Sequence, residues 1–157
     1  MRITTKSKYG IRMIVEIASQ PEGKAISLKS VARKLNVSEK YLEQIVIPLT
    51  RSGYLKSQRG PTGGYIMGAP ADTLTAQMVI DALEGKDSQR ACIGEVGGCP
   101  RADTCAVIDL WKRINKAISS ITTTTTIADL VTTRQDKYSK LGLSESLIRS
   151  DKSACNV

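Results

Sequence analysis

Apolar residues recur along this chain at helical spacing, in short segments separated by polar breaks. The clearest segment has Leu28, Val31, Ala32 and Leu35 at i, i+3, i+4 and i+7, the pattern of an amphipathic helix. Ser27 precedes it as a good N-cap. The same kind of spacing predicts four further helices, over residues 5–20, from Ser38 to Gly53, and over 75–84 and 104–121.

The order of the elements in residues 27–67 predicts a winged helix-turn-helix. Two helices are separated only by Asn36-Val37-Ser38. Two short strands follow, at 54–58 and 65–67, joined by a Gly- and Pro-rich tip that begins at Arg59. Pro48 lies inside the second helix and is expected to kink or shorten its last turn.

The second half of the chain is less regular. One face of the 104–121 helix is apolar. Five threonines at 122–126 are poor helix formers and are expected to loosen the chain before a last turn or two at 127–131. The tail from Arg134 is polar and is predicted to be flexible.

The positive charge is concentrated in the first half. Residues 1–70 hold 12 Lys and Arg against 4 Asp and Glu, while residues 71–157 hold 11 of each. Such a bias favours a polyanionic partner, either nucleic acid or an anionic membrane. No segment has the composition of a membrane span or a signal peptide, so we expect a cytoplasmic protein that does not insert into membranes.

The outer face of the second helix of the motif suits the reading of DNA. Lys40 and Arg51 are expected to contact phosphates, with Lys6, Lys8 and Arg12 if the first helix faces DNA. Gln44 suits adenine, and Glu43 can accept from the N4 amine of cytosine. Glu43 would then narrow the set of acceptable sites; the alternative is a solvated charge paired with Lys40 or Lys34. The glycine-rich tip lacks the ending of a P-loop, which argues against nucleotide binding.

Three cysteines lie within 14 residues, at Cys92, Cys99 and Cys105, in a chain that has no histidine. Thiolates are the ligands of iron–sulfur clusters, and we expect such a cluster here. Structural zinc usually uses Cys-x-x-Cys pairs, which the spacings of six and five residues do not match. A zinc site and a redox thiol switch remain the alternatives. Cys105 is predicted to begin a helix, whose positive dipole end favours a thiolate.

Three motifs in this order resemble the bacterial iron–sulfur-dependent winged-helix repressors of the IscR/NsrR type. They are MRITTKSKYG at 1–10, SEKYLEQIVIPLTRSGYLKSQRGPTGGY at 38–65, and the cysteines followed by LWKRI at 110–114. The resemblance covers about residues 1–131 and implies a mainly α fold with a small β-hairpin wing and a long dimerisation helix. It also implies a homodimer that binds double-stranded DNA at an imperfect palindrome.

The resemblance assigns residues as well. Cys92, Cys99 and Cys105 match the three cluster ligands, with [2Fe–2S] favoured over [4Fe–4S]. The DNA contacts carried over by position are Ser38, Lys40, Tyr41, Glu43 and Gln44 in the recognition helix and Arg59, Gly60 and Pro61 in the wing. The apolar face of 107–121 then has two readings, core packing and dimer seam.

The fourth cluster ligand departs from the family pattern. The position of the family's histidine is Ile108 here, and the position of an acidic residue in the first helix is Lys8. The substitutes are Asp109 or Cys155, with Glu95 and Asp103 as further oxygen donors. Asp109 is four residues after Cys105, which would place both on one helix face; a solvated helix charge is its alternative reading.

The sequence therefore predicts a transcriptional regulator, mostly a repressor, that is not an enzyme and that controls iron–sulfur cluster biogenesis genes. A nitric-oxide- or redox-sensing repressor of the same family is one alternative. A small iron–sulfur electron carrier or zinc protein is another, although carriers need no basic winged helix. The expected organisation is a winged-helix domain at 1–70, a connecting helix and cysteine loop at 71–103, dimerisation and short C-terminal helices at 104–133, and a tail at 134–157.

Overall fold

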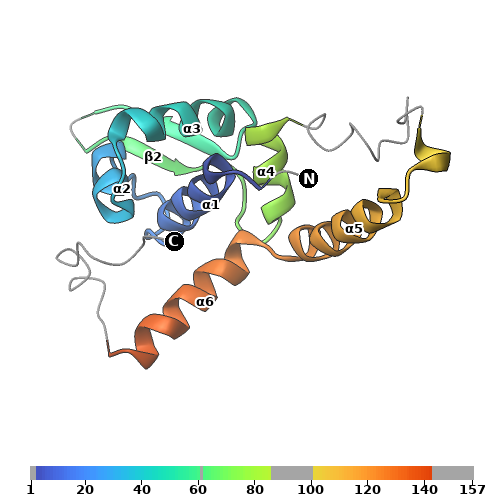
Figure 1. The fold of residues 1–157 in the computed structure, drawn as a ribbon. Coiled ribbons are helices and arrows are strands. Elements are labelled where there is room, and N and C mark those ends of the chain that lie inside the picture. The colour runs from blue at the N-terminus through green and yellow to red at the C-terminus, as the bar shows by residue number, and fades with distance from the viewer. Residues whose placement is uncertain (1–2, 61, 86–100, 143–157) are drawn as a thin grey trace.

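The computed structural model describes residues 3–60, 62–85 and 101–142. Helices α1 to α4 and a two-stranded hairpin form the body. Helix α6 packs against α1 along its first half, and α5 extends away from the body in a different direction (Figure 1). In chain order the elements are α1 (Thr5–Ala18), α2 (Leu28–Leu35), α3 (Glu39–Arg51), β1 (Leu55–Gln58), β2 (Gly64–Met67), α4 (Ala76–Glu84), the 3₁₀ turn η2 (Ala102–Thr104), α5 (Ile108–Thr124) and α6 (Ile127–Lys140).

Helix α1 contributes to the centre of the core, where its apolar stripe meets α2, α3 and α4. Met13 and Ile14 of α1 are completely buried, and so are Leu42, Ile45 and Leu49 of α3. Each of the helices α1 to α4 begins at a Ser or Thr whose side-chain oxygen accepts from a backbone N–H of the first turn. The caps and the apolar periodicity together define the helices of the body, as the sequence predicted.

The break between α2 and α3 is a left-handed turn. Asn36 has φ of 53°, and its N–H donates to the last carbonyls of α2. The helix that follows is not shortened at Pro48 but continues to Arg51. Pro48 cannot donate a backbone hydrogen bond. The buried side chains of Ile45 and Leu49 on either side of it hold the last turn against the core.

The hairpin is antiparallel, with a register that runs from Leu55 opposite Met67 to Gln58 opposite Gly64. It is tied to the segment before α2 by a bridge between Ile26 and Tyr65, whose N···O distances are 3.1 and 2.9 Å. The predicted strands are confirmed. The bridge was not predicted, and it fixes the hairpin to the helix-turn-helix.

Close backbone packing at Gly64 gives a first prediction. A Cβ at Gly64 would lie 2.3 Å from the carbonyl oxygen of Ile26, an atom that cannot move without breaking the bridge. Overpacking of this kind costs about 1–3 kcal/mol. We expect Gly64→Ala to lower the free energy of unfolding in urea by that amount and to loosen the hairpin. Gly60→Ala is the control, because Gly60 has φ of 119° but a Cβ there would meet no atom within 4 Å; equal losses from both variants would contradict this account.

Helix α6 corrects the prediction for the C-terminal region. The threonine run interrupts the helices only briefly, at Thr125 and Thr126. Thr126 and Asp129 form a reciprocal capping box that begins α6. These hydrogen bonds lower the pKa of the Asp129 carboxyl. The helix then continues past Val131 to Lys140, and only residues 143–157 of the expected tail lie outside the described part of the chain.

Candidate DNA interface and cysteine site

The outer face of α3 is the best candidate for contact with DNA. Lys40, Glu43, Gln44 and Arg51 are all exposed on it. The opposite face is buried in the core and consists of Leu42, Ile45, Val46 and Leu49. Because that face is fully used by packing, the orientation of the polar face is fixed by the core. The structure thus brings together the four polar residues that the sequence placed on one side of this helix.

Two residues that were predicted to contact DNA, Ser38 and Tyr41, also make contacts within the fold. The Ser38 side chain accepts from the N–H of Tyr41 at 3.2 Å, as the helix cap. The Tyr41 ring is half-buried and meets the Tyr9 ring edge-to-face, with centroids 5.7 Å apart. Burial, and then the proximity of Tyr9 and Glu84, raise the pKa of the Tyr41 phenol. Tyr41 joins α3 to α1, and its contact with DNA stays a prediction.

The hairpin tip presents an exposed cation, Arg59. Arg59 and Gly60 follow β1 directly and are exposed. Gly60 adopts φ of 119°, which side chains disfavour, and its carbonyl accepts from Gly63 at 2.9 Å. Pro61 lies outside the described residues. The tip can therefore carry the Arg59 guanidinium to phosphates or to a groove edge.

The start of α1 is bound to the end of α4. The hydroxyls of Thr4 and Ser7 both donate to the Glu84 carboxylate. Lys6 Nζ donates to the carbonyl of Leu83 at 2.9 Å, near the negative end of the α4 dipole. The predicted phosphate contact of Lys6 therefore competes with this bond. Lys8 is exposed in the same helix.

A buried carboxylate in α1 connects the helix-turn-helix to α6, and sequence reasoning missed it. Glu16 is only 4% exposed. It forms ion pairs with Lys34 of α2 and with Arg134 of α6, the latter at 2.8 Å. Arg134 also donates to Ser19 Oγ at 3.1 Å. The one available signal was that Glu16 interrupts the apolar stripe of α1.

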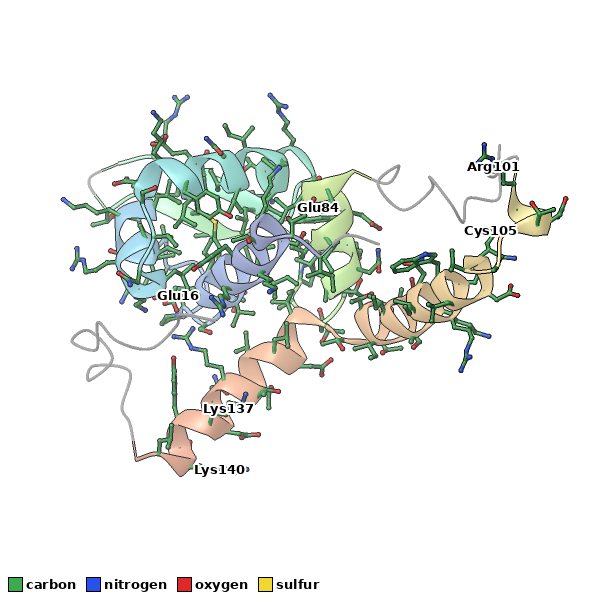
Figure 2. The ribbon with its side chains drawn as sticks, viewed as in Figure 1. Glu16, Glu84, Arg101, Cys105, Lys137 and Lys140 are labelled. Carbon is green, nitrogen blue, oxygen red and sulfur yellow. The ribbon has the colours of Figure 1, made fainter. Side chains whose placement is uncertain are left out.

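The cysteine site is described only at Cys105. Cys92 and Cys99 lie outside the described residues, as do Glu95 and Cys155. Cys105 is half-buried, with a free thiol, and lies at the outer end of α5, away from the body (Figure 2).

The backbone around Cys105 corrects one prediction. Cys105 is extended, at φ of −86° and ψ of 107°, and α5 begins only at Ile108, whose N–H donates to the Cys105 carbonyl at 3.2 Å. The residue does not begin the helix. Cys105 and Asp109 therefore do not share one helix face, and the predicted effect of the helix dipole on the Cys105 thiolate loses its basis. The ligand role of Asp109 itself stays a prediction.

The candidate oxygen ligands near Cys105 are open to solvent. The Asp109 side chain is 86% exposed and lies 3.9 Å from Lys112 Nζ, a surface pair worth little. Asp103 is exposed in η2. Within 3–60, 62–85 and 101–142, no three His, Cys, Asp or Glu residues gather as a metal site would need. A site at Cys105 therefore depends on donors from beyond those ranges or from a second chain.

Helix α5 exposes most of its apolar face. The exposed side chains are Val107, Leu110, Trp111, Ile114 and Ile121, and Ile121 reaches 65%. Only Ile108 of this helix is buried. Packing in the core of the single chain therefore explains few of the apolar residues on this face, which leaves the dimer seam as the other predicted role. Among the helices that the structure describes, none is long and apolar enough to cross a membrane.

Comparison with known proteins places the chain among bacterial regulators. The Rrf2 family, described as iron-dependent transcriptional regulators, matches residues 3–133. The chain is 38% identical over 130 residues to the HTH-type regulator CymR of Bacillus subtilis, which covers 83% of this chain and 89% of CymR. It is 31% identical over 131 residues to IscR of Yersinia enterocolitica, with 83% and 79% covered.

Solved structures agree with the sequence matches. CymR, named the global cysteine regulator of B. subtilis, superposes with a TM-score of 0.69 at 36% identity, covering 84% of this chain and 97% of CymR. IscR of T. potens has a TM-score of 0.70 at 27% identity, covering 87% and 90%. Together with the hairpin that follows α3, these likenesses confirm the predicted winged-helix fold class.

Proposed function

The chain belongs to the Rrf2 family of iron-dependent transcriptional regulators, and on that premise we propose that it is a homodimeric repressor whose DNA affinity is set by an iron–sulfur cluster. The cluster ligands are Cys92, Cys99 and Cys105, and [2Fe–2S] is favoured over [4Fe–4S]. The target is an imperfect palindrome near iron–sulfur biogenesis genes. Membership of this family also confirms the prediction of a regulator that is not an enzyme.

The proposed mode of DNA reading is carried by one observation, the fixed polar face of α3. Lys40, Gln44 and Arg51 are exposed on a helix whose other face is locked into the core. A helix of this diameter fits the major groove, where Gln44 can bind adenine and Glu43 cytosine. Arg59 at the hairpin tip then lies against the backbone or the minor groove.

The proposed homodimer is supported by the exposed apolar face of α5. A solvent-facing row that includes Leu110, Trp111 and Ile121 is unfavourable on an isolated chain. Pairing of two α5 helices would bury both rows and place two α3 helices at a fixed separation. A palindromic site follows from the two-fold symmetry of such a pair.

The three cysteine thiols near the start of α5 are ligands of the type that iron–sulfur clusters use. Three thiols stand within 14 residues, and the described one, Cys105, is half-buried with no disulfide. When bound, the cluster supplies redox and ligand-exchange chemistry sensitive to iron and oxidants. The chain's own part is to hold it between the end of α4 and the start of α5 and to transmit its presence.

A route for that transmission is supported by three contacts. The end of α4 carries Glu84, which binds Thr4 and Ser7 of α1. Two residues after Ser7, Tyr9 of α1 meets Tyr41 of α3. A shift at the cysteine segment would therefore reach the recognition helix through α4 and α1, provided that the cluster binds DNA-free and DNA-bound forms unequally.

The cluster is tested by anaerobic purification followed by absorption and Mössbauer spectra. We expect cluster absorption in the wild-type protein and its loss in Cys92→Ser, Cys99→Ser and Cys105→Ser. In mobility-shift assays, wild-type protein with and without cluster should differ in affinity for the same DNA, while each cysteine variant behaves as the cluster-free form. Zinc in place of iron, or spectra unchanged in all three variants, would refute cluster control.

The fourth ligand has its own experiment. Asp109→Ala and Cys155→Ala are compared for cluster spectrum and lifetime in air, with Asp136→Ala as a control on the exposed surface of α6. Loss or a changed spectrum in only one of the first two variants identifies the ligand. If all three match the wild-type protein, neither residue is a ligand, and the fourth ligand is Glu95, Asp103, a small molecule or a residue of the partner chain.

A second candidate function, the thiol-based control of cysteine supply without a cluster, is favoured by the likeness to CymR. That relative is named a global cysteine regulator, and the CymR of Staphylococcus aureus, 34% identical, was solved in an oxidized form. This function predicts that iron-free protein binds its site fully and that mild oxidation alone changes the affinity. If the Cys92→Ser variant still binds its site fully without iron and still changes its affinity on mild oxidation, cysteine-type thiol control is favoured over cluster control.

A further inference from the structure

One apolar side chain interrupts the polar face of the recognition helix. Ile47 is 49% exposed, although the apolar residues around it on α3 are buried. Its neighbours one turn away on the same face are polar and exposed: Glu43, Gln44, Thr50 and Arg51. The residue therefore lies in the middle of the surface that faces DNA.

Burial against the residues that the structure describes does not account for isoleucine at this position. Ile47 directly precedes Pro48 inside the helix. A residue before proline is disfavoured in the helical conformation, and a β-branched side chain further lowers helix propensity. The exposed side chain offsets neither cost by burial. Helix propensity, packing and solubility would all favour another residue here. A position of this kind is a candidate for contact with a binding partner.

We infer that Ile47 reads a thymine through its C5-methyl group in the major groove. This inference rests on the proposed DNA-binding function and adds a specificity-determining residue to it. Apolar contact with that methyl group is the one apolar recognition that the major groove offers. The β-branched side chain is stiff in a helix and is held in one orientation, as a specific contact requires.

The position of that thymine follows from helix geometry. Ile47 lies four residues beyond Glu43, which is about 6 Å along the helix axis. Base pairs are stacked about 3.4 Å apart. The thymine should therefore lie within about two base pairs of the base that Glu43 contacts.

The test begins with selection of binding sites from random DNA by the full-length protein, with the Glu43→Ala variant run in parallel to locate the base that Glu43 reads. Each thymine of the selected site is then replaced by deoxyuridine, which removes only the methyl group. Binding constants are measured by fluorescence anisotropy for the wild-type protein, Ile47→Ala and Ile47→Val. Met78→Ala on α4 is the control, an apolar truncation at a side chain that is also partly exposed.

For the wild-type protein and Met78→Ala, we expect one thymine in each half-site to be sensitive to loss of its methyl group. Uracil at this position in one half-site should weaken binding about fourfold, the value of one buried methyl group, and uracil in both half-sites about 16-fold. Ile47→Ala should bind thymine DNA about as weakly as the wild-type protein binds uracil DNA, with no further loss on uracil. Ile47→Val should keep part of the discrimination.

Two failures are distinguishable in this experiment. If selection enriches no sequence, the proposed DNA-binding function fails, and the inference fails with it. If a site is enriched but every uracil substitution affects wild-type protein and Ile47→Ala equally, only the reading by Ile47 is wrong. A methyl-sensitive thymine far from the base that Glu43 reads would overturn the predicted position.

Discussion

Replacing Glu16 with alanine should lower the free energy of unfolding by about 3 kcal/mol, the lower end of the range for a broken buried ion pair. The carboxylate is buried between Lys34 and Arg134, whose side chains are 25% and 16% exposed. Its removal leaves two cations without their counter-charge in places that water reaches poorly. The same change should release α6, because Arg134 is one of the residues by which α6 is held to α1.

The expected loss is measured by urea unfolding followed by circular dichroism, with Glu22→Ala as the control for loss of an exposed carboxylate. A double-mutant cycle with Arg134→Ala isolates the contribution of the pair. Faster amide exchange over 127–140 in Glu16→Ala would show the release of α6. If Glu16→Ala were as stable as Glu22→Ala, the ion pairs would contribute nothing to the fold.

A charge on the apolar face of α5 should separate the proposed dimer. Trp111→Glu buries an unpaired carboxylate in the seam, and it should give a monomer in analytical ultracentrifugation. DNA affinity should fall about 100-fold or more, because the second half-site no longer binds as part of the same complex. The variant should remain folded, since Trp111 is 47% exposed on the single chain.

Ser120→Glu is the matched control for this experiment. It adds the same charge to α5 at an exposed residue on the side away from the apolar row. It should leave both the dimer and the DNA affinity near wild-type values. A dimeric Trp111→Glu protein with full affinity would exclude α5 as the seam, and a monomeric wild-type protein would exclude the homodimer itself.

The sequence predicted the body of the fold well because its elements are defined locally. Leu28, Val31 and Leu35 repeat at helical spacing, and the cap at Ser38 precedes a second such run. The glycines and the proline between the two strands predicted a tight turn. The exposed face of α3 followed from the same periodicity, because an amphipathic helix can bury only one side.

The errors in the C-terminal region come from side-chain contacts that the propensity of single residues does not include, some of them local and some distant in the sequence. The threonines at 122–126 are poor helix formers, yet most of them extend α5 while their hydroxyls bond to carbonyls of the preceding turn. Helix α6 is long because Ile127 is buried and Arg134 reaches Glu16. Neither contact is visible in a short window of sequence.

The candidate site was only partly accessible to sequence reasoning. Residue types and spacing singled out Cys105, but not that it is extended and precedes α5 by a turn. Gln44 and Glu43 drew attention as polar residues that suit base edges, whereas Ile47 was assigned neither to the core nor to the DNA-contacting face. Helical spacing alone places Ile47 on the same face as Lys40 and Gln44, and the structure adds that its side chain is exposed.

The joint between α4 and α5 has a consequence for how such regulators diversify. Thr75 and Thr126 form a bridge, and Ala76 donates to the Thr125 carbonyl at 2.9 Å, so the start of α4 is tied to the end of α5. In the sequence, the cysteine segment lies between the other ends of these two helices, the end of α4 at Glu84 and the start of α5 at Ile108. Changing the length of a connection between anchored elements costs only about 0.6 kcal/mol per doubling. The proposed sensing chemistry could therefore be changed by insertion, deletion or exchange of this segment while the winged-helix body keeps its architecture.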